Sequence, residues 1–263
     1  MRITLNGLRL CLGLVAPMLL AVASPAQSWQ STQNQTLQPE AEQLLALANQ
    51  ARAAHGAGPL HWDSALAAAA RQHCLRMAAE GPISHRYEGE EDLTERAGHA
   101  GAHFSLIEEN VAIGPSAAAI HDEWMHSPGH RTNLLNPEVD RVGLAVVAAP
   151  GGLYAAADYG RAVPVLSQAQ VEAEVARLVQ VSGVTVSHDP TTARVYCMQS
   201  SGSMGGNRPT FLMRWQDADL THLPDQLVDR LGTGKYRHAA VGSCPAQDVE
   251  GAFTAYRVAV LLF

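Results

Sequence analysis

Several common protein classes leave no signature in this sequence. Only 16% of its 263 residues are charged, the formal net charge is −7, and lysine and arginine form no run. A nucleic-acid binder usually presents a basic surface, so this charge balance disfavours a nucleic-acid partner. The sequence also has no Gly-x-Ser-x-Gly elbow, Walker phosphate loop or dinucleotide-binding glycine pattern. It therefore gives no support to those hydrolase, nucleotide-binding and dehydrogenase classes.

Long apolar runs are also scarce, and the one present lies at residues 10–22. It follows Arg2 and Arg9 and precedes two groups of small residues, an order typical of a secretory signal peptide. A membrane-spanning helix needs about 20 apolar residues, and this run is shorter, although an uncleaved anchor is the alternative. We therefore predict a signal peptide over 1–26, export to the periplasm or the medium, and no transmembrane span after cleavage.

Cysteine is rare, with four in the chain, of which Cys11 lies inside the predicted signal peptide. An exported protein meets oxidising conditions, so disulfides are plausible. Cys197 and Cys244 both lie in the C-terminal part and are expected to pair with each other. Cys74 falls in an apolar helical stripe, which favours a small buried thiol, with an intermolecular bond as the alternative.

Hydrophobic patterning divides the chain after a polar lead-in at residues 27–37. Residues 38–162 show helices first, ending at His55, near Gly81 and before Pro128, and a hairpin pattern last, over 142–159. Asp63 and Ser116 are suited to cap the second and third of these helices. Helices followed by a hairpin indicate an α+β fold rather than the alternation of a parallel sheet.

The C-terminal part, residues 163–263, is predicted to be a linking helix and a small α+β accessory domain. Ser167 and Gln170 form a capping box for a helix over 168–180. A short helix is expected with Pro224 in its first turn and Gly232 after its end. Strands are predicted over 194–198, 211–215, 239–244 and 253–263. No catalytic pattern is recognisable in this part.

Three segments of the first part stand out: Ile83-Ser84-His85-Arg86, Glu108 to Ala112, and Trp124-Met-His-Ser-Pro-Gly-His-Arg-Thr-Asn-Leu-Leu135. Together with Asn49 and Arg52 before them and Tyr154 to Tyr159 after them, they occur in the order of a bacterial CAP domain (cysteine-rich secretory, antigen 5, pathogenesis-related; also called SCP-like). The resemblance covers about 120 residues, and the 124–135 string is its most specific part. It implies an α-β-α sandwich with a central cleft.

The resemblance also implies a site. His85 matches the first family histidine, Glu109 the acidic residue before asparagine, and His130 the second histidine, so these three are the expected cleft and ligand-binding residues. Two imidazoles and a carboxylate suit Zn²⁺ and leave a fourth position open for water. Asn110, Ser127 and Arg131 are expected to support the site. Ser127 stands where animal and plant members carry a second acid, and Glu108 replaces a glycine, which leaves open which glutamate points inward.

Three functions remain open on this sequence. The first is an exported binding module for a divalent ion, a small ligand, a lipid or an envelope component. The second is a peptidase or esterase in which zinc-bound water attacks the substrate and Glu109 is ligand or base. A single carboxylate can hardly fill both roles, which favours binding. In the third, the CAP fold is a scaffold that presents residues 163–263. The sequence gives no information on oligomeric state.

Overall fold

The computed structural model describes residues 38–199, 208–247 and 252–263. The predicted signal peptide and lead-in lie outside these residues. Among the described residues, no helix combines the length and the apolar character needed to cross a bilayer. The described residues contain two separate four-stranded sheets. The predicted division between residues 162 and 163 stays a prediction.

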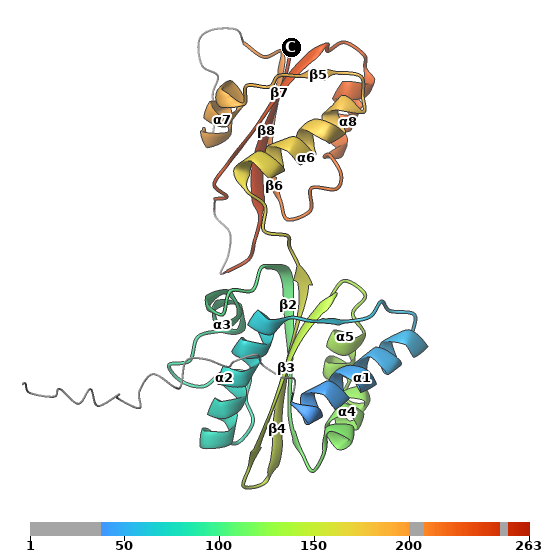
Figure 1. The fold of residues 1–263 in the computed structure, drawn as a ribbon, viewed down its shortest axis with the longest axis vertical. Coiled ribbons are helices and arrows are strands. Elements are labelled where there is room, and N and C mark those ends of the chain that lie inside the picture. Colours follow the sequence, from blue (N-terminus) through green and yellow to red (C-terminus); the bar gives the residue numbers. More distant parts are fainter. Residues whose placement is uncertain (1–37, 200–207, 248–251) are drawn as a thin grey trace, which may run out of the picture. The chain divides into compact units, whose positions relative to one another are not determined.

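Residues 39–162 form the unit that we call the first sandwich, with its sheet in the order β1-β3-β4-β2. In Figure 1, α2 and α3 lie on one side of this sheet and α1, α4 and α5 on the other. The elements are α1 (Pro39–Ala54), β1 (His61–Trp62), α2 (Ser64–Glu80), α3 (Leu93–His99), β2 (Phe104–Gly114), α4 (Ala117–His126), α5 (Pro128–Leu135), β3 (Arg141–Ala149) and β4 (Gly152–Ala162). The expected α+β class and α-β-α layering are confirmed.

The local signals of the sequence act as expected at several helix ends. The carboxylate of Asp63 accepts the backbone N–H groups of residues 65 and 66, and the Ser116 hydroxyl caps α4 through residue 119. Ser127 ends α4, but Pro128 then occupies the first turn of a further helix, α5, which the sequence analysis missed. Proline suits that position because its fixed φ is helical and its missing N–H would be unpaired there.

The core of the first sandwich is split by its sheet into two layers. Leu44, Trp124 and Tyr159 belong to the larger layer, under α1, α4 and α5. Cys74 and Met77 belong to the layer under α2. Alternate residues of β2 and β4 enter opposite layers because side chains alternate across a strand. The two faces of β2 can therefore carry different chemistry.

Residues 168–262 form the second sandwich, with its sheet in the order β5-β7-β8-β6. Helix α7 lies on one face, and α6 and α8 lie on the other (Figure 1). The elements are α6 (Gln168–Gln180), β5 (Thr185–Val186), α7 (Thr191–Met198), β6 (Phe211–Asp217), α8 (Asp225–Gly232), β7 (His238–Cys244) and β8 (Tyr256–Leu262). The Ser167–Gln170 capping box of α6 is present as predicted.

The prediction of a strand over 194–198 is wrong, since these residues end α7. The run Arg-Val-Tyr-Cys-Met is too short for its periodicity to separate a strand from a helix. The helix begins at Thr191, where the Asp189 side chain accepts the backbone N–H, and Ala193, Tyr196 and Cys197 face the core. The bounds of α8 also differ slightly, because Gly232 is its last residue rather than the residue after it.

Cysteine pairing follows the prediction. Cys197 and Cys244 form a disulfide with a Cα–Cα distance of 5.8 Å, and Cys74 is a buried free thiol. Burial raises the pKa of the Cys74 thiol to about 12, so it stays protonated and unreactive near neutral pH.

Candidate functional site

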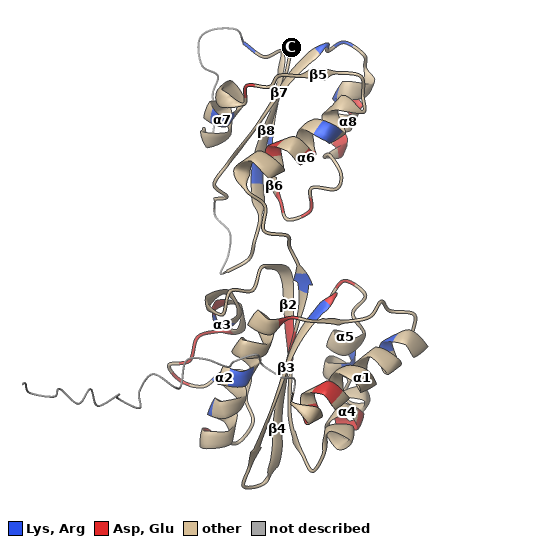
Figure 2. Cartoon of the chain, in the orientation of Figure 1, with Lys and Arg blue, Asp and Glu red and all other residues tan. Residues whose placement is uncertain are grey.

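The candidate site lies at β2, which is the edge strand of the first sheet. Figure 2 shows acidic colour on this strand, where Glu108 and Glu109 are consecutive. Successive side chains point to opposite faces of the sheet, so the two carboxylates separate. Glu109 turns toward the α2 layer with a side chain only 4% exposed, whereas Glu108 accepts a hydrogen bond from Asn136 beyond α5. The glutamate in the site is therefore Glu109.

The structure brings His85 and Glu109 into direct contact. His85 lies in the segment between α2 and α3, and its Nδ1 is 2.8 Å from Oε1 of Glu109. The hydrogen bond to Glu109 raises the pKa of His85, outweighing the burial that would lower it. Because Nδ1 faces the carboxylate and the ring is 60% exposed, the other ring nitrogen, Nε2, is the one available to a ligand.

The second carboxylate oxygen of Glu109 accepts a hydrogen bond from Arg96, a residue that the sequence does not single out. Nη2 of Arg96 donates to Oε2 of Glu109 at 2.6 Å, and the arginine side chain is 3% exposed. Its Nη1 donates to the carbonyl oxygens of His85 and Glu91. Arg96 therefore fixes the carboxylate and also the backbone that carries His85. Both oxygens of Glu109 are engaged, so the carboxylate acts as an orienting group.

His73 and Glu90 hold the same segment from the other side. The fully buried ring of His73, on α2, contacts a Glu90 carboxylate oxygen at 2.7 Å and the Ser84 carbonyl at 2.8 Å. Glu90 in turn accepts the backbone N–H of Tyr87. Residues 84–90 are thus tied to α2 at both ends, which limits the positions that His85 can occupy.

His130 reaches the site from α5, on the opposite face of the edge strand. Its Nδ1 is buried without a hydrogen-bond partner. Burial lowers the pKa of His130, the charge of His85 lowers it further, and the carboxylate of Glu123 partly opposes both. The charge of His85 therefore disfavours protonation of His130, so that the pKa of His130 is lowered whereas that of His85 is raised.

The supporting residues take different places. Asn110 is buried and donates to the His130 carbonyl at 2.9 Å, which joins β2 to α5, while Asn133 donates to the Asn110 side chain. Ser127 lies between α4 and α5 and makes no side-chain cap. Arg131 is exposed and its guanidinium lies 3.2 Å from His55, away from Glu109. Of these three, only Asn110 contacts a residue of the site.

Asp158 is a second buried acid that the sequence analysis missed. It pairs with Glu109 across β2 and β4 and is 0% exposed. Burial, and after it the nearby charge of Glu109, raises the pKa of Asp158 well above its usual value, so the neutral acid is favoured. An aspartate inside the apolar run Leu153 to Tyr159 is itself a signal, because a buried charge needs a reason.

A direct metal site would need several donors that converge. Within residues 38–199, 208–247 and 252–263, no group of three or more His, Cys, Asp or Glu side chains is arranged to hold a metal ion. Among the predicted ligands, a direct contact joins His85 to Glu109, and a carboxylate in that place orients a histidine ring. Zinc binding through all three residues stays a prediction.

Part of the first sandwich matches a known protein family. Residues 45–159 match the model of the cysteine-rich secretory protein family, CAP. YlbC, an uncharacterized membrane protein of Bacillus subtilis, is 32% identical over 109 residues, which is 40% of this chain and 31% of YlbC. YkwD of the same organism is 27% identical over 107 residues, which is 40% of this chain and 42% of YkwD. The chain thus spans a third to two-fifths of these relatives.

Among solved structures, an extracellular SCP-domain protein of Bacillus anthracis is similar at a TM-score of 0.43 with 28% identity. That likeness covers 46% of this chain and 40% of the other. The match to the family model runs from residue 45 to residue 159. It therefore contains His85, Glu109 and His130. Residues 45–159, which form most of the first sandwich, therefore match the CAP family.

Proposed function

We propose that this is an exported binding protein whose CAP domain holds a small ligand or a divalent ion between His85 and His130. The disulfide supports export, because disulfides persist in oxidising compartments. The observation that carries the binding function is the engagement of both Glu109 oxygens, by His85 and by Arg96. A carboxylate held in this way orients a histidine and leaves that ring's other nitrogen for a ligand.

The same observation weighs against the hydrolase. A general base must reach the water or nucleophile that it deprotonates. Glu109 is buried and paired on both oxygens, and burial raises the pKa of Asp158, its partner across the sheet, which disfavours a second carboxylate there. The position of the second family acid is occupied by Ser127. The site therefore presents ring nitrogens to a ligand and no free carboxylate.

Protonation should control this binding. A divalent ion needs a neutral imidazole, and the pKa of His85 is raised by Glu109 whereas that of His130 is lowered by burial. His85 is then the last of the pair to become available as the pH rises. Affinity for a metal ion should increase as the pH passes through the raised pKa of His85 and then level off.

The test is calorimetric titration of the chain with zinc, comparing wild type with His85→Ala/His130→Ala. His126→Ala is the matched control, since His126 is an exposed histidine on α4. Loss of binding only in the double variant supports the proposal. Equal binding in all three proteins, or none in wild type, contradicts it. A metal-dependent hydrolysis of peptide or ester substrates that chelation abolishes would favour the enzyme instead.

A further inference from the structure

The two sandwiches have the same chain topology. In each, a helix leads to a two-residue strand, a second helix, an edge strand, further helix and a hairpin, and the first sandwich has the additional helix α3 between α2 and β2. The sheet orders β1-β3-β4-β2 and β5-β7-β8-β6 correspond strand for strand. The short strand is parallel to its neighbour in both, and the other pairings are antiparallel in both. The correspondence therefore includes strand direction as well as order.

Close packing of the second helix on the sheet repeats as well. A Cβ on Gly143 of β3 would lie 2.0 Å from the backbone nitrogen of Ala67 in α2. A Cβ on Gly242 of β7 would lie 2.3 Å from the backbone nitrogen of Arg194 in α7. Both strands thus need glycine where the helix backbone touches the sheet. Topology alone does not require this shared detail.

Each second helix also carries a cysteine, but not at the same helix position, since Cys74 lies seven residues after Ala67 and Cys197 three residues after Arg194. The Sγ of Cys74 in α2 lies 3.2 Å from the carbonyl oxygen of Tyr154 and 3.4 Å from that of Ala145, two residues after Gly143. Cys197 in α7 is bonded to Cys244, two residues after Gly242. The second sandwich thus has a covalent bond where the first has a weak thiol hydrogen bond.

The site positions differ between the two sheets. Gly143 pairs with Asp158, which pairs with Glu109. In the second sheet Gly242 pairs with Ala259, which pairs with Arg214. The buried acid is thus replaced by alanine, and the site glutamate by arginine.

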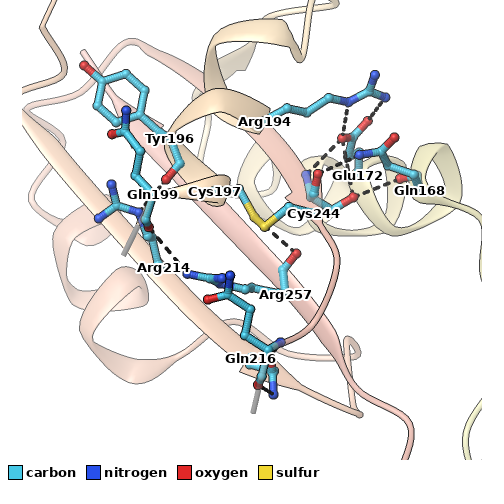
Figure 3. The surroundings of a disulfide bond; sticks show 12 residues. Gln168, Glu172, Arg194, Tyr196, Cys197, Gln199, Arg214, Gln216, Cys244 and Arg257 are labelled. Atoms are coloured by element: carbon cyan, nitrogen blue, oxygen red, sulfur yellow. Dashed lines mark hydrogen bonds and ion pairs between the residues drawn. A yellow bond between two sulfur atoms is a disulfide. The ribbon is translucent and has the colours of Figure 1, made fainter. Parts of the chain in front are cut away.

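The arginines on this face of the second sheet anchor α7. Figure 3 shows Arg214 and Arg257 beside the end of that helix. Arg214 donates to the Tyr196 carbonyl and Arg257 to the Gln199 carbonyl. Cationic groups stabilise a helix C-terminus, where carbonyl oxygens lack partners. Arg214 and Arg257 therefore stabilise α7, whereas the corresponding face of the first sheet carries the His85–Glu109 pair.

We propose that the described residues of 168–263 are a second sandwich of the CAP type, in which helix-anchoring arginines and a disulfide replace the ligand site, so that the described part of the chain carries one ligand site. The repeat stands on the geometry of the second sandwich by itself. The statement of one ligand site rests on the proposed function of the first.

The repeat is tested by nuclear Overhauser effects in the full chain. We expect contacts between Gly143 Hα and the Ala67 amide proton and, equally, between Gly242 Hα and the Arg194 amide proton. Presence of the first contact without the second overturns the repeat. Gly242→Ala should lower the melting temperature, whereas Gly232→Ala, where a Cβ meets open space, should not. Equal tolerance of both substitutions would also overturn it. The contacts in wild type decide the case if Gly242→Ala does not fold.

The single site is tested by zinc titration with the histidine ring resonances as the readout. We expect one equivalent per chain that shifts His85 and His130, and its loss in His85→Ala/His130→Ala. A second equivalent that survives in the double variant and shifts His188, His222 or His238 would overturn the single-site claim. Absence of zinc binding in wild type would contradict the proposed function and leave the repeat to the Overhauser contacts.

Discussion

The two sandwiches share one strand order but differ in the residues on the sheet face that their second helix covers. In the first, His73, Arg96, Glu109 and Asp158 are all buried in or beside one edge of the sheet. In the second, that face holds a disulfide and arginines that cap a helix. Buried ionisable groups cost free energy unless a network satisfies them. These buried groups are concentrated in the first sandwich. A local concentration of destabilising groups is expected at a functional site.

The first helix of each sandwich carries one buried charged residue. Arg52 of α1 is fully buried and donates four hydrogen bonds, to the carbonyls of Gly58, Leu134, Asn136 and Val139. Glu172 of α6 is 8% exposed and accepts two from Arg194 and one from the Ser243 backbone. A charged residue of the first helix therefore organises distant segments in both sandwiches.

The largest predicted effect is that of Arg52→Met. Four buried or half-buried carbonyls lose their donor, and each unsatisfied buried group costs about 1–3 kcal/mol. With partial rescue by water we expect a loss of about 4 kcal/mol in the free energy of unfolding, measured by urea denaturation. Glu172→Gln should cost less, about 1–2 kcal/mol, because its partner Arg194 is 38% exposed. A larger effect of Glu172→Gln would reverse the comparison.

Removal of the disulfide should act on one sandwich only. The bond closes a loop with a sequence separation of 47, for which loop-closure entropy gives about 4 kcal/mol. Strain and residual structure usually reduce such values, so we expect Cys197→Ala/Cys244→Ala to cost about 3 kcal/mol. Amide hydrogen exchange should accelerate in residues 168–262 and stay unchanged in 39–162. Equal acceleration in both parts would show that they unfold as one cooperative unit.

Asp158→Asn should change the pH dependence of stability. The native pKa is raised, so the contribution of the neutral acid is complete below the unfolded pKa and is lost as the pH rises through the native value. Asparagine remains neutral, and we expect a gain of about 1 kcal/mol, or about 2–4 °C in melting temperature, at pH 7. The gain should vanish near pH 4.

A matched control for that experiment is Asp122→Asn on α4, where the carboxylate is 75% exposed. This variant should follow the wild-type melting temperature at both pH values. A destabilised Asp158→Asn protein at pH 7 would mean that the ionised form of Asp158 is required in the fold.

The smallest predicted effect concerns a residue first expected to support the site. Arg131 is exposed and contacts His55 rather than Glu109. Arg131→Ala should change the free energy of unfolding by less than about 0.5 kcal/mol and leave zinc affinity unchanged. By contrast, Arg96→Met should weaken zinc binding by about 10–100-fold, because it removes the group that fixes Glu109. A loss of zinc affinity in Arg131→Ala would place that residue in the site.

The sequence predicts the parts of this molecule that depend on local rules. Three features follow from side-chain chemistry near in sequence or from the number of cysteines. They are the caps at Asp63 and Ser167, the β3–β4 hairpin and the pairing of Cys197 with Cys244. Residues 194–198 of helix α7 suit a strand as well as a helix, because a run of five residues is too short for its periodicity to separate the two. Helix α5 was missed because Ser-Pro-Gly indicates a stop more strongly than a new start.

The site is only partly readable from the sequence, for a different reason. His85, Glu109 and His130 are separated by more than 20 residues, and resemblance rather than spacing brought them together. Arg96 and His73 act through contacts that exist only once α2, α3 and β2 have packed. Their residue types carry no local signal, since arginine on a short helix and histidine beside an apolar stripe are commonly surface or core residues.

In the proposed site, Glu109 is held by Arg96 and orients His85 so that Nε2 of His85 faces the ligand. The most direct measurement is a long-range ¹H–¹⁵N spectrum of the histidine rings in the full chain, above the raised pKa of His85. Neutral His85 should carry its proton on Nδ1, donating to Glu109, and zinc should then shift its Nε2 resonance. A proton on Nε2 of His85, with no response to zinc, would contradict it.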